Sequence, residues 1–395
     1  MLLPNTVPFA VPDVGEAEID AVVEVLGSRW LTTGKKCRDF EERFAESVNA
    51  TYAVALNSCT AALHLSLEAL GVTAGDRVYM SPYTFAATAE VVRYLDATPV
   101  FVDIDPVTLN IDVSKLREAV ERDLDGQRGR PRAVIPVHIA GIACDMDEIW
   151  RLARDTDIAV IEDAAHAFPA HYAGRSVGSI PEGIRGTACF SFYATKTLTT
   201  GEGGMVTTED PEVADRIRTM SLHGLSRQAW SRYESGGSWA YDIVAPGYKY
   251  NLTDVAAAMG LVQLDRAREM LDRRRQIARA YNAAFSDSDG LDCPIVPKHR
   301  NSAWHLYVLR LNRGISPVGR DDLVQHLNRD GIGASVHFIP LHLHSYYRDA
   351  YDLKPFDFPQ SLREYERSLS LPIYSAMSDT DVEKVIDSVL EAQRA

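Results

Sequence analysis

The chain has 395 residues, of which 46% are hydrophobic and 24% charged, a composition ordinary for a globular protein with two domains. Its net charge of −14 argues against a nucleic-acid binder, which needs a basic face, and no apolar run approaches the length of a membrane span. Five scattered cysteines, odd in number, and the lack of any basic residue before Arg29 predict a cytoplasmic protein without a secretory signal.

Residues 50–210 alternate short apolar strands with helical stretches. The predicted strands are Tyr52–Leu56, Arg77–Met80, Pro99–Val102, Ala133–Val137, Ala159–Ile161, Ala188–Phe192 and Gly204–Thr207. Near-continuous apolar strands that alternate with helices indicate a mostly parallel sheet covered on both faces. We therefore expect an α/β fold whose large domain holds a seven-stranded, mostly parallel sheet.

A capped helix follows the first predicted strand. Ser58 suits the N-cap position, the apolar residues Leu63, Leu67 and Leu70 share one helical face, and Gly71 ends the helix. A helix N-terminus presents free N–H groups and the positive end of a dipole, so it can hold a phosphate. The same pattern also fits an ordinary helix cap, and both interpretations stay open on these residues alone.

Two charged residues stand at the ends of apolar strands. Asp163 ends one strand, and Lys196 follows the apolar run Cys189–Tyr193. A buried lysine loses its proton more easily than a surface lysine, and the neutral amine can form a Schiff base with a carbonyl. Such a lysine, with an aspartate for a pyridinium nitrogen, is the pair that pyridoxal phosphate (PLP) requires. Taken singly, Lys196 also fits a lysine that points to water, and Asp163 also fits the cap of a turn.

Other predicted strands also end in polar residues. Asn57–Thr60, Ser81–Phe85 and His138 each follow a strand directly. Because ligands on parallel sheets bind beyond the carboxyl ends of the strands, we expect these residues to share one edge with Asp163 and Lys196.

The chain after residue 210 begins with a polar insertion. Residues 226–247 contain a Gly/Ser tract, which predicts a surface loop near the site. A long helix is predicted over Thr253–Phe285, and its basic run Arg273–Arg275 is typical of a solvated helix face.

A smaller α+β domain is predicted at the C-terminal end. It contains the strand His305–Leu311, a helix, and an extended stretch over Ala334–Ile339. We place the large PLP-binding domain at residues 1–265 and the small domain at residues 266–395.

Motifs spread in order over nearly the whole chain resemble one family, the DegT/DnrJ/EryC1/StrS family of PLP-dependent sugar aminotransferases. The similar segments are Leu31–Gly34, Asn57–Leu65, Ser81–Thr88, Val102–Asp105, Val137–Gly141, Glu162–Ala167, Ser191–Gly204, Gly247–Asp254 and His337–His342. The resemblance implies a fold type I PLP-dependent transferase. One departure is Cys59, where that family usually has glycine or alanine, although contacts through the backbone remain possible there.

The resemblance implies roles for the residues around the cofactor ring. Lys196 is expected to form the Schiff base with PLP and then to shuttle the proton. Asp163 is expected to pair with the pyridinium nitrogen, Phe85 to stack on the ring, and His166 to lie against the ring and its phenolic oxygen. A buried structural histidine is the alternative for His166.

The resemblance also implies how the phosphate is held. Cys59 and Thr60, at the helix start, and Ser191 are expected to bind it. Asn251 resembles the family asparagine that reaches the phosphate from the neighbouring subunit, which implies a homodimer with shared active sites. An ordinary cap of the following helix is the alternative for Asn251.

Three further residues resemble positions near the substrate, namely Lys249, His337 and His342. The histidines at 337, 342 and 344 suggest a metal site, but their spacing fits no helical ligand pair and no carboxylate or cysteine joins them. We therefore expect no metal.

The implied reaction is transfer of an amino group, with glutamate as the expected donor, to a keto sugar linked to a nucleotide. The motifs around Lys196 and Asp163 favour a 4-keto-6-deoxy sugar. The alternatives are a 3-keto sugar or cyclitol aminotransferase, a PLP-dependent sugar dehydratase, and a non-catalytic regulator. In the known dehydratases of this family a histidine replaces the lysine, and no DNA-binding segment is evident, so the last two are disfavoured.

Overall fold

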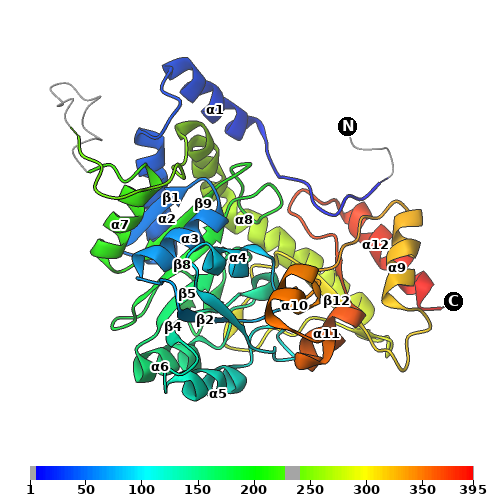
Figure 1. Cartoon of the computed structure of the whole chain (residues 1–395). Coiled ribbons are helices and arrows are strands. Elements are labelled where there is room, and N and C mark those ends of the chain that lie inside the picture. Colours follow the sequence, from blue (N-terminus) through cyan, green and yellow to red (C-terminus); the bar gives the residue numbers. More distant parts are fainter. Residues whose placement is uncertain (1–5, 227–240, 395) are drawn as a thin grey trace.

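The computed structural model describes residues 6–226 and 241–394 (Figure 1). Of the loop predicted at 226–247, residues 227–240 lie outside the described residues. The described part divides into a large layered α/β unit and a smaller C-terminal unit, joined along one long helix, α8 (Asp254–Phe285).

The large unit is built on a seven-stranded sheet with the order β1-β9-β8-β5-β4-β2-β3. Its strands are β1 (Tyr52–Leu56), β2 (Asp76–Met80), β3 (Thr98–Phe101), β4 (Arg130–Ile135), β5 (Ala159–Asp163), β8 (Gly186–Ser191) and β9 (Gly204–Thr208). Only β9 runs against its neighbours, and the other strands share one direction. The predicted mostly parallel sheet is therefore confirmed, with strand ends that shift by a few residues.

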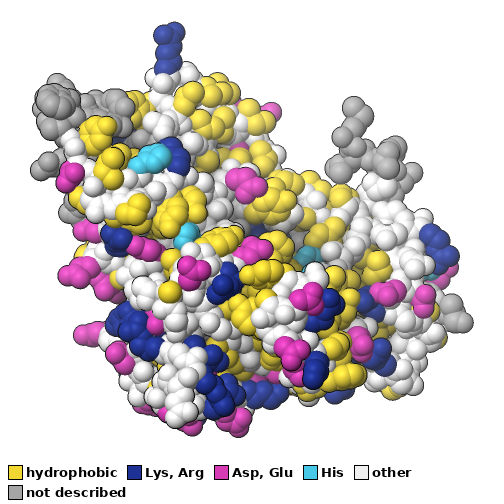
Figure 2. Space-filling view, in the orientation of Figure 1, with side chains coloured by type: hydrophobic (Ala, Val, Ile, Leu, Met, Phe, Trp, Pro, Cys, Tyr) yellow, Lys and Arg dark blue, Asp and Glu magenta, His cyan; other side chains and the backbone are white. Residues whose placement is uncertain are grey.

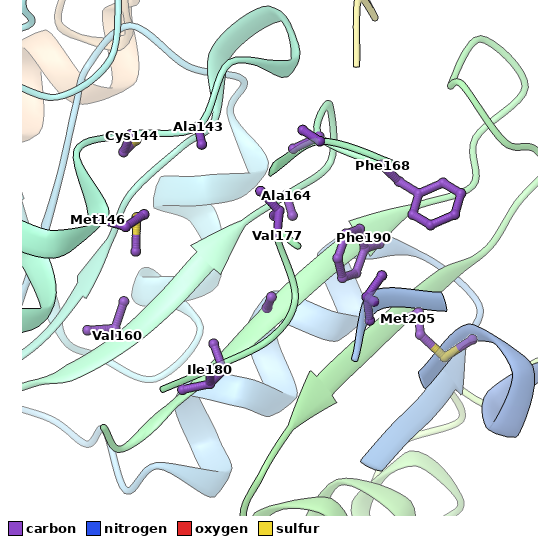
Figure 3. Close-up of a cluster of buried hydrophobic side chains, with 14 of the residues drawn as sticks. Ala143, Cys144, Met146, Val160, Ala164, Phe168, Val177, Ile180, Phe190 and Met205 are labelled. Carbon is purple, nitrogen blue, oxygen red and sulfur yellow. The ribbon is translucent and has the colours of Figure 1, made fainter. Parts of the chain in front are cut away.

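Helices cover both faces of this sheet, because alternate strand residues point to opposite sides. One face packs against α2 (Lys35–Val48), α5 (Val113–Asp123), α6 (Met146–Thr156) and the start of α8. The other face packs against α3 (Cys59–Ala69), α4 (Ala87–Arg93) and α7 (Pro211–Ser221). On the first face, Figure 3 shows Phe168, Phe190 and Met205 close together, and the two phenyl rings lie 6.2 Å apart.

The small unit packs helices on a three-stranded sheet. The sheet is made of β10 (Leu291–Asp292), β12 (Tyr307–Leu311) and β13 (Ser368–Leu371), and its core also takes in α9 (Arg320–Arg329), α12 (Asp379–Ala392) and the end of α8. The N-terminal segment joins it: the Val7 amide donates to Gly331 O at 2.8 Å, and Val7 O accepts from the Gly333 amide at 2.8 Å. Figure 1 shows this segment running from α1 (Glu16–Ser28) across to α9 and α12.

The remaining elements are short. They are α10 (Ser345–Tyr351), α11 (Pro359–Arg367) and a separate sheet of β6 (His171–Tyr172), β7 (Arg175–Ser176) and β11 (Arg300–Asn301). No helix in the ranges 6–226 and 241–394 combines the length and the apolar composition that a bilayer crossing requires.

The continuous helix α8 passes from one unit to the other. Its early residues Ala257 and Ala267 belong to the core of the large unit, whereas Ile277 and Tyr281 belong to that of the small unit. The predicted domain boundary after residue 265 lies inside this helix, so the division at that point stays a prediction.

One sequence interpretation of α8 is wrong. The run Arg273–Arg275 was expected on a solvated face, but Arg274 is buried, with 4% of its surface exposed. Its Nη1 donates to Trp304 O at 3.2 Å and to Ile373 O at 2.7 Å. A buried guanidinium needs acceptors for its donors, and here two backbone carbonyls of the small unit accept from Nη1, whereas Nε has no partner among the described residues.

The start of α8 also anchors α2. The Asp254 carboxylate accepts from the amides of Gly34 at 2.7 Å, Lys36 at 3.2 Å and Cys37 at 3.0 Å. These are the N-cap and first-turn amides of α2, which lack acceptors within their own helix. A buried carboxylate at this point also complements the positive end of the helix dipole.

Replacing Asp254 with alanine is expected to lower the free energy of unfolding by about 1–3 kcal/mol, because one buried and two partly buried amides lose their acceptor. Asp254→Asn keeps the shape and one acceptor oxygen, so it should lose less. Urea denaturation followed by circular dichroism measures both. Equal unfolding midpoints for Asp254→Ala and the unaltered protein would contradict this account of the α2 cap.

Candidate active site

A cavity of about 490 Å³ opens at the carboxyl ends of the strands of the large sheet. Its walls come from both units, since residues after β5 and β8 meet the segments around His305 and Phe338. Eight of the predicted site residues line it: Cys59, Thr60, Phe85, Asp163, His166, Ser191, Lys196 and His337. The expected shared edge is therefore present in part as one cavity, whereas His138, which was also expected there, does not line it and contacts Glu162 instead.

Lys196 stands in the turn that follows β8. Its backbone amide donates to Tyr193 O at 2.9 Å, and its Nζ lies 3.5 Å from His305 Nε2. Burial of the ammonium lowers the pKa of Lys196 to about 8, although Cys59 and the Asp163 carboxylate act in the opposite direction. A substantial share of this amine is therefore neutral near physiological pH, which a nucleophile requires.

Asp163 is the last residue of β5, and its carboxylate is buried. Oδ2 accepts from Thr88 Oγ1 at 2.8 Å, and Oδ1 accepts from the Ala165 amide at 3.2 Å. Burial raises the pKa of Asp163 above its ordinary value, and these two hydrogen bonds and the charge of Lys196 only partly offset that effect. Within the described residues no Lys or Arg forms an ion pair with it, so the carboxylate faces the cavity without a cation.

Another wall of the cavity is formed by the start of α3. Ser58 caps this helix, since its Oγ accepts from the Ala61 amide at 3.1 Å. The amides of Cys59 and Thr60, in the first turn, have no acceptor within the helix. Gly204 of β9 permits the close approach of this turn, because a Cβ there would lie 2.6 Å from the Cys59 nitrogen. The result is a cradle suited to an anion.

Aromatic rings form the walls between the lysine and the entrance. Phe85 is 63% exposed, and its ring centroid lies 6.1 Å from that of Phe338. His166 stacks on Phe338 at 5.8 Å, with an angle of 19° between the rings. Burial holds the pKa of His166 well below its usual value, with Lys196 and His337 acting in the same direction.

Several cavity residues were not predicted from the sequence, and three of them contact predicted site residues. Thr88 holds the Asp163 carboxylate, His305 approaches Lys196, and Phe9 stacks on His337 with centroids 5.2 Å apart. For Thr88 the available signal was its place in the segment Ser81–Thr88 that carries the resemblance, and its hydroxyl lies 2.9 Å from that of Thr84. Nothing in the local pattern around Phe9 or His305 distinguishes them from ordinary core residues.

Three predicted residues do not line the cavity. Lys249 Nζ contacts Asn251 Oδ1, and Asn251 Nδ2 donates to Thr33 Oγ1 at 2.8 Å beside a second hollow of about 440 Å³. His342 is buried in a short 3-10 helix, where Nε2 lies 3.2 Å from Pro355 O and the ring packs on Phe358. Across the described ranges, no cluster of three or more His, Cys, Asp or Glu side chains could hold a metal ion.

The residues around the cavity fit PLP. The cradle at the start of α3 offers to a phosphate amides that have no acceptor within their helix, and Phe85 offers a ring face. The buried Asp163 carboxylate lacks a cation, which a protonated ring nitrogen would supply, and Lys196 offers an amine with a lowered pKa. A cofactor with a phosphate at one end and a basic nitrogen at the other therefore satisfies groups that the protein leaves unsatisfied.

Known proteins resemble the chain over almost its entire length. The sequence profile of the DegT/DnrJ/EryC1/StrS aminotransferase family matches residues 12–390. The spore coat polysaccharide biosynthesis protein SpsC of Bacillus subtilis is 49% identical over 383 residues, which cover 97% of this chain and 96% of SpsC.

Solved structures share the fold. Spr1654 from Streptococcus pneumoniae superposes with a TM-score of 0.90 in its PMP form and 0.89 in its PLP form, at 34% identity over 98% of this chain and 99% of that one. The aminotransferase TlmJ from Streptoalloteichus hindustanus gives a TM-score of 0.87 at 35% identity, over 98% of this chain and 100% of TlmJ. The chain therefore belongs to the DegT/DnrJ/EryC1/StrS aminotransferase family, and it is a PLP-dependent sugar aminotransferase of fold type I.

Proposed function

We propose that this enzyme transfers an amino group from glutamate to C4 of a 4-keto-6-deoxy sugar that is linked to a nucleotide. The observation that carries the proposal is the pair in one cavity: the Lys196 amine, whose pKa is lowered to about 8, and the buried Asp163 carboxylate. The name of SpsC, a polysaccharide biosynthesis protein, supports a sugar precursor as the substrate class. The motif resemblance supports the nucleotide, the C4 position and the donor.

PLP, when bound, supplies an aldehyde for the amino group and a ring that accepts the electron pair left at the donor Cα. The first-turn amides at Cys59 and Thr60, with Ser191, would hold its phosphate. Asp163 would keep the proton on its ring nitrogen, because a carboxylate beside that nitrogen favours the charged form. Phe85 would cover the cofactor ring. The buried His166 would exclude water from the space beside that ring.

Lys196 carries the proton in both halves of the reaction. The neutral amine takes the proton from the donor Cα as a general base and returns it as a general acid. A pKa of about 8 suits both tasks, since the amine gains and loses a proton at little cost near neutral pH. Donor and sugar use the same cavity in turn, so ping-pong kinetics are expected.

The proposal includes a homodimer with shared active sites. Lys249 and Asn251 lie outside the cavity of their own chain, and Asn251 lines the second hollow, as residues that serve a partner subunit would. The helix α1 exposes the apolar stripe of Ile19, Val23 and Leu26, each more than half exposed. Figure 2 shows hydrophobic side chains over this helix, and an exposed stripe of that kind suits an interface.

An activity assay distinguishes the alternative functions from the proposed one by their products. Amination of a 3-keto sugar or of a cyclitol ketone would identify another branch of the family. Release of ammonia without net amination would identify a dehydratase, and PLP binding without turnover would identify a regulator. The proposal also keeps a cytoplasmic location, which the five free cysteines support.

Lys196→Ala is expected to abolish the Schiff-base absorption band of added PLP and to slow amination by at least about 10²–10⁴-fold, since both nucleophile and proton carrier are lost. Lys298→Ala, at an exposed position, is the matched control and should keep both. Absorption spectra and mass spectrometry of a panel of 4-keto and 3-keto nucleotide sugars, with glutamate, provide the readouts. A Lys196→Ala protein that still forms the band and aminates a sugar would refute the proposal.

Asp163→Asn is expected to slow the half-reaction with the donor by about 10–10³-fold, because an amide cannot keep the proton on the ring nitrogen. Thr88→Val removes only one hydrogen bond to that carboxylate and should slow it by about tenfold or less. Single-turnover absorption changes measure both rates. An Asp163→Asn protein less impaired than Thr88→Val would contradict the assigned role of the carboxylate.

Mixed dimers test the shared site. Lys196→Ala and Asn251→Ala are each expected to be impaired alone. When the two are expressed together, the hybrid contains one site with an intact lysine and an intact asparagine, so activity should reappear. Activity assays of the purified hybrid decide this. No recovery, although the hybrid forms, would mean that Asn251 serves its own chain.

A further inference from the structure

His305 reaches from the small unit into the active-site cavity, just before β12. Its Nε2 lies 3.5 Å from Lys196 Nζ. The ring is 7% exposed, and its Nδ1 is buried without a hydrogen-bond partner in the part of the chain that the structure describes. None of the roles assigned above uses this side chain, although it contacts the reacting amine directly.

The surroundings of His305 keep its imidazole neutral. Burial holds the pKa of His305 well below its usual value, and Lys196, His166, Arg274 and His337 act in the same direction. The ring of His166 lies 4.3 Å away, centroid to centroid. A neutral imidazole carries a hydrogen on one nitrogen and a lone pair on the other, so one nitrogen of His305 is an acceptor.

The protonation state of Lys196 determines which ring nitrogen of His305 accepts a hydrogen bond from it. Below its pKa, Lys196 is an ammonium, which offers N–H donors and no lone pair. A contact between this group and Nε2 therefore needs the lone pair of His305 at Nε2, with the ring hydrogen on Nδ1. When Lys196 loses its proton, the amine still has N–H groups, and the same bond can persist.

We propose that His305 is a positioning residue that accepts one N–H of the free Lys196 amine at Nε2 and so directs the amine lone pair at the substrate. The lone pair of a tetrahedral nitrogen points away from its N–H bonds, and here it is turned from His305 toward the rest of the cavity. The inference rests on the proposed role of Lys196 as the proton carrier. It assigns to the small unit a part in orienting the amine that carries the proton.

The backbone that carries His305 is held by both units. Arg274 of α8 donates to Trp304 O at 3.2 Å, and the Ala303 amide donates to Gly141 O at 3.0 Å. Gly141 allows the close approach, since a Cβ there would lie 3.1 Å from the Ala303 nitrogen. The position of the His305 imidazole is therefore fixed relative to Lys196, as a positioning role requires.

Two amide variants test whether the contact of Nε2 with the Lys196 amine matters, or only the presence of a polar group at position 305. The longer side chain of the His305→Gln variant would carry its amide where Nε2 lies, whereas that of His305→Asn carries it where Nδ1 lies. The first measurement is the rate at which apoprotein captures PLP, followed by absorption as a function of pH. The second is the single-turnover rate of the holoprotein with glutamate, compared with glutamate deuterated at Cα.

The unaltered protein should capture PLP faster as pH rises through about 8, where Lys196 becomes neutral. In His305→Asn the Lys196 ammonium loses an acceptor and is less stable, so the pH midpoint of PLP capture should move to a lower value. Its single-turnover rate should fall about 10- to 100-fold, with a larger isotope effect, because a misplaced amine slows the proton transfer itself. His305→Gln should restore the midpoint and most of the rate.

A pH midpoint and an isotope effect unchanged in His305→Asn would overturn the inference, as would a His305→Gln protein impaired to the same degree. If His305→Asn does not fold, His305→Leu is measured in its place with the same expectations. An unaltered protein that captures PLP but does not respond to glutamate would count against the proposed donor. The capture midpoints would then still decide whether His305 contacts the amine.

Discussion

The active site depends on keeping an amine and a carboxylate out of water at one edge of the sheet. Burial lowers the pKa of Lys196 and raises that of Asp163, so each group is pushed toward its neutral form. Neither has an ion-pair partner among the described residues that would relieve this burial. The cofactor brings the missing charges, a phosphate for the start of α3 and a basic nitrogen for the carboxylate, and its binding should therefore stabilise the folded protein as well as activate it.

Much of the large unit could be predicted, because its signals are local. Each strand is an apolar run bounded by polar residues, and Ser58, with the leucines that follow, marks α3. Many of the polar residues that follow these strands, among them Thr60, Asp163 and Lys196, line one cavity because parallel strands share a carboxyl edge. The motif resemblance supplied the roles of these residues. Composition and spacing alone are equally consistent with a cofactor site and with ordinary helix and turn caps.

The rest could not be predicted, because it depends on contacts between distant segments. Arg274 belongs to a basic run typical of a surface, and only the packing of α8 against the small unit shows that carbonyls accept from its Nη1. His305 was predicted as the first residue of a strand, yet it approaches Lys196 across the boundary between the units. Conversely, His342 matches a motif near the substrate, but a short helix turns it into the core against Phe358.

The pairing of Val7 with the segment around Ile332 has a consequence for how the chain acquires its structure. The small unit takes its core from both ends of the sequence, and the helix α8 that supports it also packs on the large sheet. Contacts between residues so far apart require the closure of a long loop, which makes them late and slow to form. On the ribosome the large sheet has all its strands before the small unit has its own, so the cavity is completed only after the segments around His305 and Phe338 have joined the large unit.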